Sequence, residues 1–595
     1  MRTIIRNIIR TIIRIIERTP IDNREQKNIT DKEKYLQDFE LDSKDGFTFG
    51  SLRLADVDID VINNIIKEDN YKTARLETLI SPEHQELYEQ VKTKRKLFTF
   101  DEFINLEYPI NERSRKFYKK DLDGFFEYIQ DIKPQLAIFF LDYFQPYFKD
   151  SVRHCHTYMT GKTGLGKSEV MKNIIYNHIL RKNCSVILLE PHGDLSEQVY
   201  KSKIFLDPEQ AKRLVVIDNN LSKDKTPIIN IFDQIKCDNE EDLDIFSQNL
   251  AKALTGLCSS QGQAASLTER METVLRFCVR VVLRIEGSCL QDLIRFMSND
   301  NADLIELGKK DPNHATRDFF ENQDFNKGYK ESKDGIYYRL QSIAQNTNFS
   351  YLTTGKSTIN IRKIMNTRGI LIVNLSKGGV GEYTSEAFGK LLIALIKTVT
   401  FLRNKQPEWQ RRENTVHVFI DEFQNFMSDD VITILTEGRK YEVFFTLANQ
   451  FVGQGLSDEK ELKAFLGNTG MKIVAQTTPS NSRKITEDMF IKPEQVNKLP
   501  IGEYYLNYEN SKKVPITIKI KGVEKYLKDS YENKTTWQTI KNAQVSTYYV
   551  EKWKYTYNAT KPPQNENKAH YKPNNNKKES RKQGDKPNFN DSDFE

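Results

Sequence analysis

The octapeptide at residues 161–168, G-K-T-G-L-G-K-S, restricts the fold of this chain more than any other feature. The pattern G-x-x-x-x-G-K-S forms a loop between a buried strand and a helix, where its glycines let backbone N–H groups approach phosphate. Residues 156–160 predict the strand, and residues 169–180 predict the helix. The alternative is a glycine turn that only opens a helix, but a chance match to the whole pattern is rare. The sequence therefore predicts an α/β domain with a phosphate-binding loop.

The last two residues of this loop carry side chains that suit a nucleoside triphosphate. Lys167 can reach the β- and γ-phosphates with its ammonium group, and the Ser168 hydroxyl can ligate Mg²⁺. The positive end of the following helix adds to the attraction for phosphate. The predicted ligands are ATP and Mg²⁺, and the remaining phosphate-binding residues are Gly161, Lys162, Thr163, Gly164, Leu165 and Gly166.

A second motif, V-H-V-F-I-D-E at residues 416–422, supplies acidic groups. Its apolar residues predict a strand buried in a parallel sheet, and ligands of such sheets bind at the carboxyl ends of the strands. Asp421 is therefore predicted to hold the metal beside the loop, and Glu422 to orient or deprotonate water. Taken alone, an acidic pair at a strand end is typical of a solvated turn. The two motifs together predict hydrolysis of ATP.

A third candidate, Gln450, closes the strand predicted for residues 443–450. The distance from Asp421 to this strand leaves room for one helix, so the second strand is expected in the same parallel core. In ATPases with this loop that use a glutamate as base, a polar residue at the tip of the next strand contacts the γ-phosphate. The alternative for Gln450 is an ordinary amide at a strand end.

The composition limits the other classes of function. With 595 residues the chain has room for three or four units, and its net charge of +6 permits contact with nucleic acid without requiring it. The six cysteines show no C-x-x-C spacing, which argues against a zinc ribbon or a disulfide framework and favours a reducing cytosol. No stretch approaches about 18 uninterrupted apolar residues, so we expect no membrane-spanning helix.

The first twenty residues predict a basic amphipathic helix. Its arginines recur every four residues between isoleucine pairs, at Arg2, Arg6, Arg10, Arg14 and Arg18. Residues 1–19 can lie on an anionic membrane surface, contact another copy of the chain, or precede a later true start of translation. The predicted location is the cytoplasm, and the first alternative adds peripheral contact with the inner face of the membrane.

The whole pattern predicts six segments along the chain. They are an amphipathic helix at 1–20, an N-terminal, helix-rich accessory domain at 21–149, the first half of a motor domain at 150–236, a helical insertion at 237–345, the second half of the motor at 346–520 and a C-terminal extension at 521–595. Strand-like runs at 185–189, 213–218 and 369–375 alternate with helical runs, which indicates a parallel sheet. The tail from about residue 560 is rich in Asn, Lys and Pro and is predicted to be disordered.

Five strings carry a resemblance to a known family. In order they are R-H-C-H-T-Y-M-T-G-K-T-G-L-G-K-S, E-P-H-G-D-L, I-V-N-L-S-K-G, V-F-I-D-E-F-Q-N-F and E-G-R-K-Y-E-V-F-F-T-L-A-N-Q. Over roughly residues 150–520 the chain resembles the HerA/FtsK superfamily of DNA-pumping ATPases, and within it most resembles the TraG/TraD-type coupling proteins of type IV secretion. The resemblance implies a RecA-like P-loop motor that forms a hexameric ring, hydrolyses ATP between subunits and threads DNA through its pore.

The same resemblance implies the roles given above for the loop, the acidic pair and Gln450, and it adds Arg439. Arg439 matches the position from which this family reaches the nucleotide of a neighbouring subunit, which would make hydrolysis depend on assembly. Considered without the family, Arg439 is an arginine suited to a surface salt bridge. Glu190 stands where relatives usually carry aspartate before the proline, and neither Glu190 nor Asp194 is assigned a catalytic role.

The leading prediction is therefore an ATP-driven motor that translocates DNA, as in conjugative transfer through type IV secretion or in HerA-like pumping. Coupling proteins normally carry N-terminal membrane-spanning helices and none is visible here. This leaves open a soluble translocase, a viral genome-packaging ATPase, or a coupling protein that docks through the helix predicted for residues 1–20. A nucleotide-switched docking module at a secretion complex is the alternative from another class. The implied partners are DNA, further copies of the chain and, depending on the pathway, a relaxase, a nuclease or a secretion-channel protein.

Overall fold

A computed structural model of the chain describes residues 46–48, 147–234, 239–259, 269–322, 325–456, 459–509, 515–521 and 534–552. The predictions for residues 1–20 and for the tail from about residue 560 lie outside these described residues. Of the predicted accessory domain, the structure describes one short pairing, in which β1 (Gly46–Thr48) runs antiparallel to β2 (Tyr147–Lys149).

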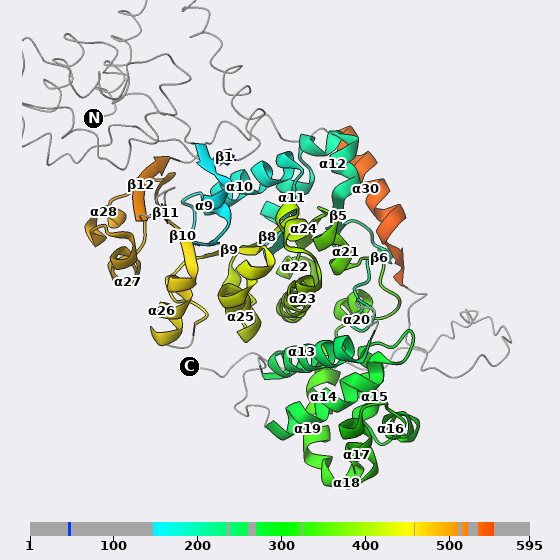
Figure 1. Ribbon diagram of the computed structural model, residues 1–595. Coiled ribbons are helices and arrows are strands. Elements are labelled where there is room, and N and C mark those ends of the chain that lie inside the picture. Colours follow the sequence, from blue (N-terminus) through cyan, green and yellow to red (C-terminus); the bar gives the residue numbers. More distant parts are fainter. Residues whose placement is uncertain are drawn as a thin grey trace, which may run out of the picture. The chain divides into compact units, whose positions relative to one another are not determined.

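The centre of the described chain is a nine-stranded sheet in the order β12-β11-β10-β3-β9-β8-β4-β7-β5 (Figure 1). All neighbours from β10 to β5 are parallel, whereas β11 and β12 are added antiparallel at one edge. The strands are β3 (His156–Thr160), β4 (Cys184–Glu190), β5 (Leu214–Ile217), β7 (Ile370–Asn374), β8 (Thr415–Ile420), β9 (Val443–Asn449), β10 (Thr469–Val474), β11 (Glu503–Glu509) and β12 (Pro515–Lys521). The predicted α/β class with a parallel core is confirmed.

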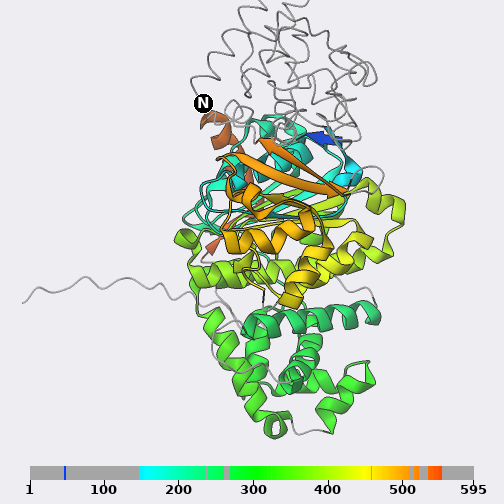
Figure 2. The same ribbon diagram turned by 90° about the vertical axis from the view of Figure 1, so that its left-hand side faces the viewer.

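The sequences of the inner strands explain this arrangement. Every residue of β4, β7, β8 and β9 is buried, and most of their side chains are aliphatic or aromatic. A parallel strand is covered by helices on both faces and therefore needs apolar side chains on both. Helices α10 (Lys167–Arg181) and α11 (Asp194–Tyr200) cover one face, and α23 (Glu382–Leu402) and α25 (Asp429–Glu437) cover the other (Figure 1). Figure 2 shows the same layers from the side.

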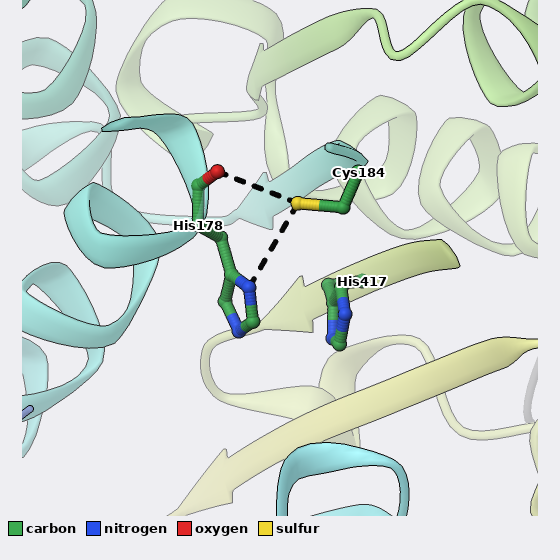
Figure 3. Close-up of side chains that lie close together, drawn as sticks. All are labelled: His178, Cys184 and His417. Carbon is green, nitrogen blue, oxygen red and sulfur yellow. Dashed lines mark hydrogen bonds between the residues drawn. The ribbon is translucent and has the colours of Figure 1, made fainter. Parts of the chain in front are cut away.

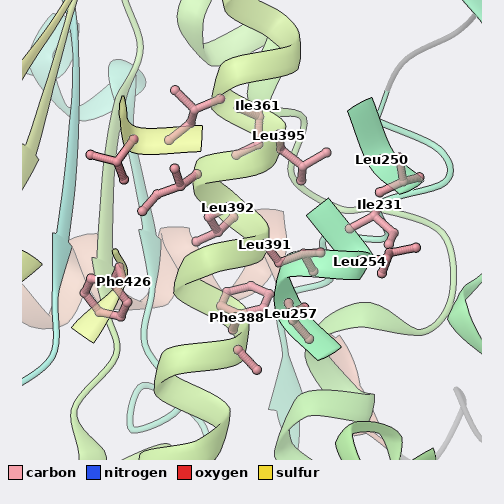
Figure 4. Close-up of a cluster of buried hydrophobic side chains, with 14 of the residues drawn as sticks. Ile231, Leu250, Leu254, Leu257, Ile361, Phe388, Leu391, Leu392, Leu395 and Phe426 are labelled. Carbon is pink, nitrogen blue, oxygen red and sulfur yellow. The ribbon is translucent and has the colours of Figure 1, made fainter. Parts of the chain in front are cut away.

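Helix α23 joins the sheet to the helical insertion within one hydrophobic core. Phe388 and Leu391 of α23 lie beside Leu254 of α13 (Glu240–Ser259), the first helix of the insertion (Figure 4). All three side chains are buried. Burial of apolar surface contributes about 25 cal/mol per Å², so this contact is expected to hold the insertion against the motor.

The other side of α23 packs against the segment that follows β8. A Cβ at Gly389 would lie 2.3 Å from the ring of Phe426, so glycine is required for this close approach. Lys397 of α23 pairs with Asp430 of α25 at 2.6 Å, and both side chains are buried. A buried charge is stable only with such a partner. No helix in the described part of the chain is long and apolar enough to cross a membrane.

The described residues between β6 (Lys225–Thr226) and β7 are mostly helical, and they include most of the stretch 237–345 for which a helical insertion is predicted. They form α13, α14 (Glu269–Leu283), α15 (Leu290–Met297), α16 (Ala302–Lys309), α17 (His314–Glu321), α18 (Phe325–Gly328), α19 (Lys330–Ala344), α20 (Thr347–Thr353) and α21 (Ile361–Asn366). Buried Arg280 of α14 contacts the carboxylates of Glu240, Asp244 and Asp311, which ties three parts of the insertion together. The predicted boundaries at residues 237 and 345 stay predictions.

The edge strand β5 is covered by α30 (Lys534–Tyr548), a contact that the sequence pattern does not predict. The Gln544 side chain forms hydrogen bonds with the backbone of β5, as a neighbouring strand would. Its Oε1 accepts from Val216 N at 3.0 Å, and its Nε2 donates to Leu214 O at 2.9 Å. The Tyr549 hydroxyl donates to Val216 O at 3.0 Å. An uncovered strand edge invites pairing with other chains, so this segment protects the sheet.

Candidate active site

Three neighbouring parallel strands, β3, β9 and β8, have their carboxyl ends on the same side of the sheet, which is called the site edge below. The loop of residues 161–168 follows β3, Gln450 follows β9, and the pair Asp421 and Glu422 follows β8. The structure therefore brings three of the predicted motifs together at the site edge, where parallel sheets bind ligands.

The side chain of Lys167 folds back across the loop. Its buried Nζ donates to the carbonyl oxygens of Gly161, at 2.6 Å, and Lys162, at 3.2 Å. Burial lowers the pKa of the Lys167 ammonium, while the carboxylates of Glu422 and Asp421 oppose that shift. The ammonium thus lies within the loop and within electrostatic reach of both acidic groups.

The N-terminus of α10 is open toward the loop. Gly166 precedes this helix with a φ of +91° and, as a glycine, has no side chain to cap the first turn. The first backbone N–H groups of a helix, together with its partial positive charge, attract phosphate when nothing else caps them. Leu165 is buried, whereas the exposed residues of the loop are Lys162, Thr163, Gly164 and Ser168.

Glycine is required at the start of the loop. Gly161 has a φ of +155°, and a Cβ there would lie 2.5 Å from the Cβ of Ala475, which follows β10. The next residue continues this contact, because Lys162 N donates to Gln476 O at 3.0 Å. The beginning of the loop is therefore fixed by a segment far away in the sequence.

Ser168 and Asp421 meet directly, as expected for two ligands of one metal. Ser168 Oγ donates to Asp421 Oδ2 at 3.1 Å, and the other carboxylate oxygen accepts from Glu422 N at 2.9 Å. Burial, reinforced by the neighbouring Glu422 carboxylate, raises the pKa of Asp421. A hydroxyl and a carboxylate oxygen are ligands that Mg²⁺ prefers, so the donor set fits this ion.

Glu422 has a strained backbone conformation, and its carboxylate lies between two side-chain amides. Its φ of +46° is in the left-handed region, which non-glycine residues adopt only rarely. Its Oε1 accepts from Gln450 Nε2 at 3.1 Å, and its Oε2 accepts from Gln424 Nε2 at 2.6 Å. The structure thus brings the predicted Gln450 to Glu422. It also adds Gln424, whose only sequence signal is an amide two residues after the acidic pair.

Arg439 does not reach the site edge of its own chain. It lies exposed in the turn before β9, next to Gly438, and a Cβ at Gly438 would stand 3.6 Å from the ring of His156. His156 begins β3, whereas the loop follows the other end of that strand. Five residues of strand span about 15 Å, so Arg439 and the loop lie at opposite ends of the sheet.

Glu190 organises the loop after β4, next to the acidic pair. Its buried carboxylate accepts hydrogen bonds from the backbone N–H groups of His192, at 2.8 Å, Gly193, at 2.6 Å, and Ser196, at 3.3 Å. All of these bonds hold the start of α11 in place. They explain the buried carboxylate at position 190 without a catalytic role. Asp194 is exposed in the first turn of α11.

Apart from this site, His178, Cys184 and His417 lie together in the core (Figure 3). Such a group resembles a set of zinc ligands. However, Nε and Nη2 of Arg153 both contact His178 Nε2, at 3.1 and 3.0 Å, and arginine can only donate. The proton of the neutral His178 ring is therefore on Nδ1, which faces the Cys184 sulfur at 3.8 Å and has no lone pair for a metal. The group is a hydrogen-bonded part of the core.

Buried histidines make the stability of this fold depend on pH. Burial lowers the pKa of His156 to about 3, and burial also lowers the pKa values of His178 and His417 well below the usual range. The unfolded chain binds protons at these rings below a pH of about 6.5, whereas the folded chain does not. Each ring therefore contributes stability that is present above this pH. As the pH is lowered further, each ring reduces the free energy of unfolding by about 1.4 kcal/mol per pH unit, until the pH reaches the pKa of that ring in the folded chain.

For this reason we expect the temperature of the unfolding midpoint to decrease as the pH is lowered from about 7 to about 5. His417→Phe should reduce the pH dependence, because it removes one buried titrating ring and keeps an aromatic ring stacked on His178, where the centroids are 3.9 Å apart. His314→Phe is the control, since His314 is exposed on α17. Equal pH dependence in the two variants, measured by differential scanning calorimetry, would contradict this explanation.

Comparisons with known proteins found similar solved structures, whereas no match was found among curated protein sequences. It is similar to solved structures of the plasmid coupling protein TrwB in complex with ADP and Mg²⁺ (15% identity, 65% of this chain and 89% of that one, TM-score 0.48) and of VirB4 of Thermoanaerobacter pseudethanolicus (14% identity, 62% and 90%, TM-score 0.42). It is also similar to the genome packaging NTPase B204 of Sulfolobus turreted icosahedral virus 2 (14% identity, 28% and 72%, TM-score 0.20).

A family profile also matches the chain. The family is described as type IV secretion-system coupling protein DNA-binding domain, and its profile matches residues 146–502. This range contains the phosphate-binding loop, the acidic pair and Gln450. It covers more than half of the sequence and confirms the resemblance to coupling proteins, so this chain belongs to the family of type IV secretion-system coupling protein DNA-binding domains.

Proposed function

We propose that this chain binds ATP with Mg²⁺ and hydrolyses it at the site edge formed by β3, β9 and β8. The observation that carries this proposal is the meeting of Ser168 with Asp421, at 3.1 Å, directly beside Glu422. A phosphate-binding loop, a pair of metal ligands and a candidate base are thereby present at one place.

The charges of the site support this role. Lys167 supplies an ammonium group inside the loop, and the first turn of α10 offers backbone N–H groups, so a triphosphate would meet positive charge from both. Mg²⁺ would be held by Ser168 and Asp421, and its charge would offset the burial that raises the pKa of Asp421. When bound, the metal supplies neutralisation of the phosphate oxygens.

The position of Glu422 supports hydrolysis rather than transfer to another acceptor. Its carboxylate is held by the amides of Gln424 and Gln450, at 2.6 and 3.1 Å, so it has a defined orientation at the site edge. A carboxylate held in this way can orient a water molecule and accept its proton. We assign Gln450 to the γ-phosphate side of the site, because it links β9 to the base.

We further propose that hydrolysis drives the movement of DNA through a ring of six copies. The family to which the chain belongs is described by its DNA-binding domain, and the excess of basic residues gives a net charge of +6. The exposure of Arg439, at the end of the sheet opposite its own loop, supports this proposal, because such a side chain is free to contact a neighbouring copy. The family match favours secretion coupling over genome packaging.

The test is the ATP turnover of the purified full-length chain with and without DNA. We expect turnover to increase several-fold with DNA and this increase to weaken steeply as salt is raised, because contacts with phosphate release counterions. Lys167→Ala measured in parallel gives the background from contaminating ATPases. Turnover that ignores single-stranded and double-stranded DNA of every length would contradict the DNA motor, and turnover equal to the background would contradict ATP hydrolysis itself.

The remaining partners stay predictions from the sequence. They are contact of residues 1–19 with a membrane surface, and an association with a relaxase, a nuclease or a secretion-channel protein. Deletion of residues 1–19 tests the first of these, since unchanged partition onto anionic vesicles would exclude it.

A further inference from the structure

Tyr504 connects the phosphate-binding loop to a strand that is far away in the sequence. It lies on β11 with 1% of its surface exposed, and its hydroxyl donates to Leu165 O at 2.6 Å. Burial raises the pKa of Tyr504, so the hydroxyl keeps its proton and remains a donor. Nothing in the proposed chemistry uses this side chain.

The hydrogen bond fixes the direction of one peptide group in the loop. The C=O and N–H of a trans peptide point in opposite directions, so a carbonyl of Leu165 held toward β11 turns the N–H of Gly166 away from β11. Gly166 has a φ of +91° and no side chain, and a peptide next to glycine reorients at little cost. The direction of this N–H therefore depends on an external contact.

The packing around Gly166 shows that the contact is close. A Cβ at Gly166 would lie 2.7 Å from the Tyr504 hydroxyl oxygen, so the tyrosine and the glycine fit each other. The other end of the loop is held through backbone atoms, by Gln476 O on Lys162 N at 3.0 Å. Tyr504 fixes its end through a single side-chain atom, which a substitution can remove.

We propose that Tyr504 is a positioning residue for the nucleotide, and that its hydroxyl presents the Gly166 N–H to the α- and β-phosphates. The inference rests on the proposed function, because it concerns how the same loop binds ATP. Backbone N–H groups of this type of loop contact phosphates that ATP and ADP share. Loss of the hydroxyl should therefore lower the affinity for ATP and the affinity for ADP by the same factor, and it should leave the rate of the chemical step unchanged.

The experiment compares the full-length wild type with Tyr504→Phe, which removes only the hydroxyl. We expect the KM for ATP and the Kd for ADP to rise together by about five- to tenfold, the effect of one hydrogen bond, while kcat changes less than about twofold. Tyr508→Phe is the matched control, since Tyr508 is buried on the same face of β11 but four residues away from the loop contact. It should change neither constant.

Thermal unfolding of both variants separates positioning from a purely structural role. A Tyr504→Phe protein with a lowered Tm and an unchanged Kd for ADP would overturn the proposal, as would a lowered kcat with unchanged affinity. Equal rises for ATP and ADP that are absent in Tyr508→Phe would support it. If the wild type binds neither nucleotide, the proposed function fails and this inference fails with it.

Discussion

The Glu422→Gln variant is expected to bind ATP and to hydrolyse it about 10²- to 10⁴-fold more slowly than the wild type, the usual contribution of a general base. Glutamine has nearly the same size as glutamate but cannot accept a proton from water. Its amide oxygen can still accept a hydrogen bond from Gln424 or Gln450, which contact the present carboxylate at 2.6 and 3.1 Å. The site should therefore keep its shape while losing its base.

Single-turnover hydrolysis and equilibrium binding of ATP measure the two effects separately. Lys167→Ala serves as the contrasting variant, because removal of the ammonium inside the loop should weaken binding itself. Retained affinity with lost turnover in Glu422→Gln, against lost affinity in Lys167→Ala, is the expected pattern. Wild-type turnover in Glu422→Gln would show that this carboxylate does not act on water.

The same variant separates a motor from a nucleotide-controlled docking module. A motor that retains ATP but cannot hydrolyse it should stop moving along DNA. A docking module that responds to bound ATP should instead remain in its active, partner-binding state. Displacement of a protein roadblock from DNA, measured beside partner binding, distinguishes the two.

Arg439→Ala is expected to lower ATP turnover by about 10³-fold or more at unchanged ATP affinity, because an arginine supplied by a neighbouring subunit stabilises the charge of the transition state. The reason lies in the position of Arg439 before β9, at the end of the sheet away from its own loop. We therefore expect Arg439 to act on hydrolysis in another copy and not in its own. Lys440→Ala, which removes the adjacent exposed basic side chain, is the control and should change turnover little.

Mixing two inactive variants tests the same point without further substitutions. An Arg439→Ala subunit has an intact loop, and a Lys167→Ala neighbour has an intact Arg439. Mixed assemblies should therefore contain some complete sites and regain part of the wild-type turnover. Absence of any recovery, in mixtures shown to co-assemble, would contradict a role for Arg439 across the interface.

The sequence predicted the features that depend on local pattern. The loop at residues 161–168 has an unmistakable spacing, and a strand such as β8 is recognisable because a parallel strand needs apolar side chains on both faces. The meeting of Ser168 with Asp421 followed from these two predictions, since parallel strands end at one edge. Each of these steps uses residues that are close together in sequence or a general rule of sheet topology.

Contacts between distant segments were not predictable in this way. Tyr504 is one of several aromatic residues in β11, and nothing nearby marks it as the partner of Leu165. Gln544 resembles any other glutamine of a helix until it is seen against β5. The grouping of His178 with His417 likewise depends on how α10 packs on the sheet. Such pairs are selected by tertiary packing, which leaves no local signal in a single sequence.

The bond between Tyr504 and Leu165 joins positions 339 residues apart, and this has a consequence for the order of events during protein synthesis. Ribosomes add about 5–20 residues per second, so roughly 20–70 s separate the synthesis of the loop from the synthesis of Tyr504. Throughout this interval the nascent chain contains the complete loop of residues 161–168 but not the hydroxyl that binds Leu165 O. The loop therefore gains this contact only after Tyr504 has been added to the chain.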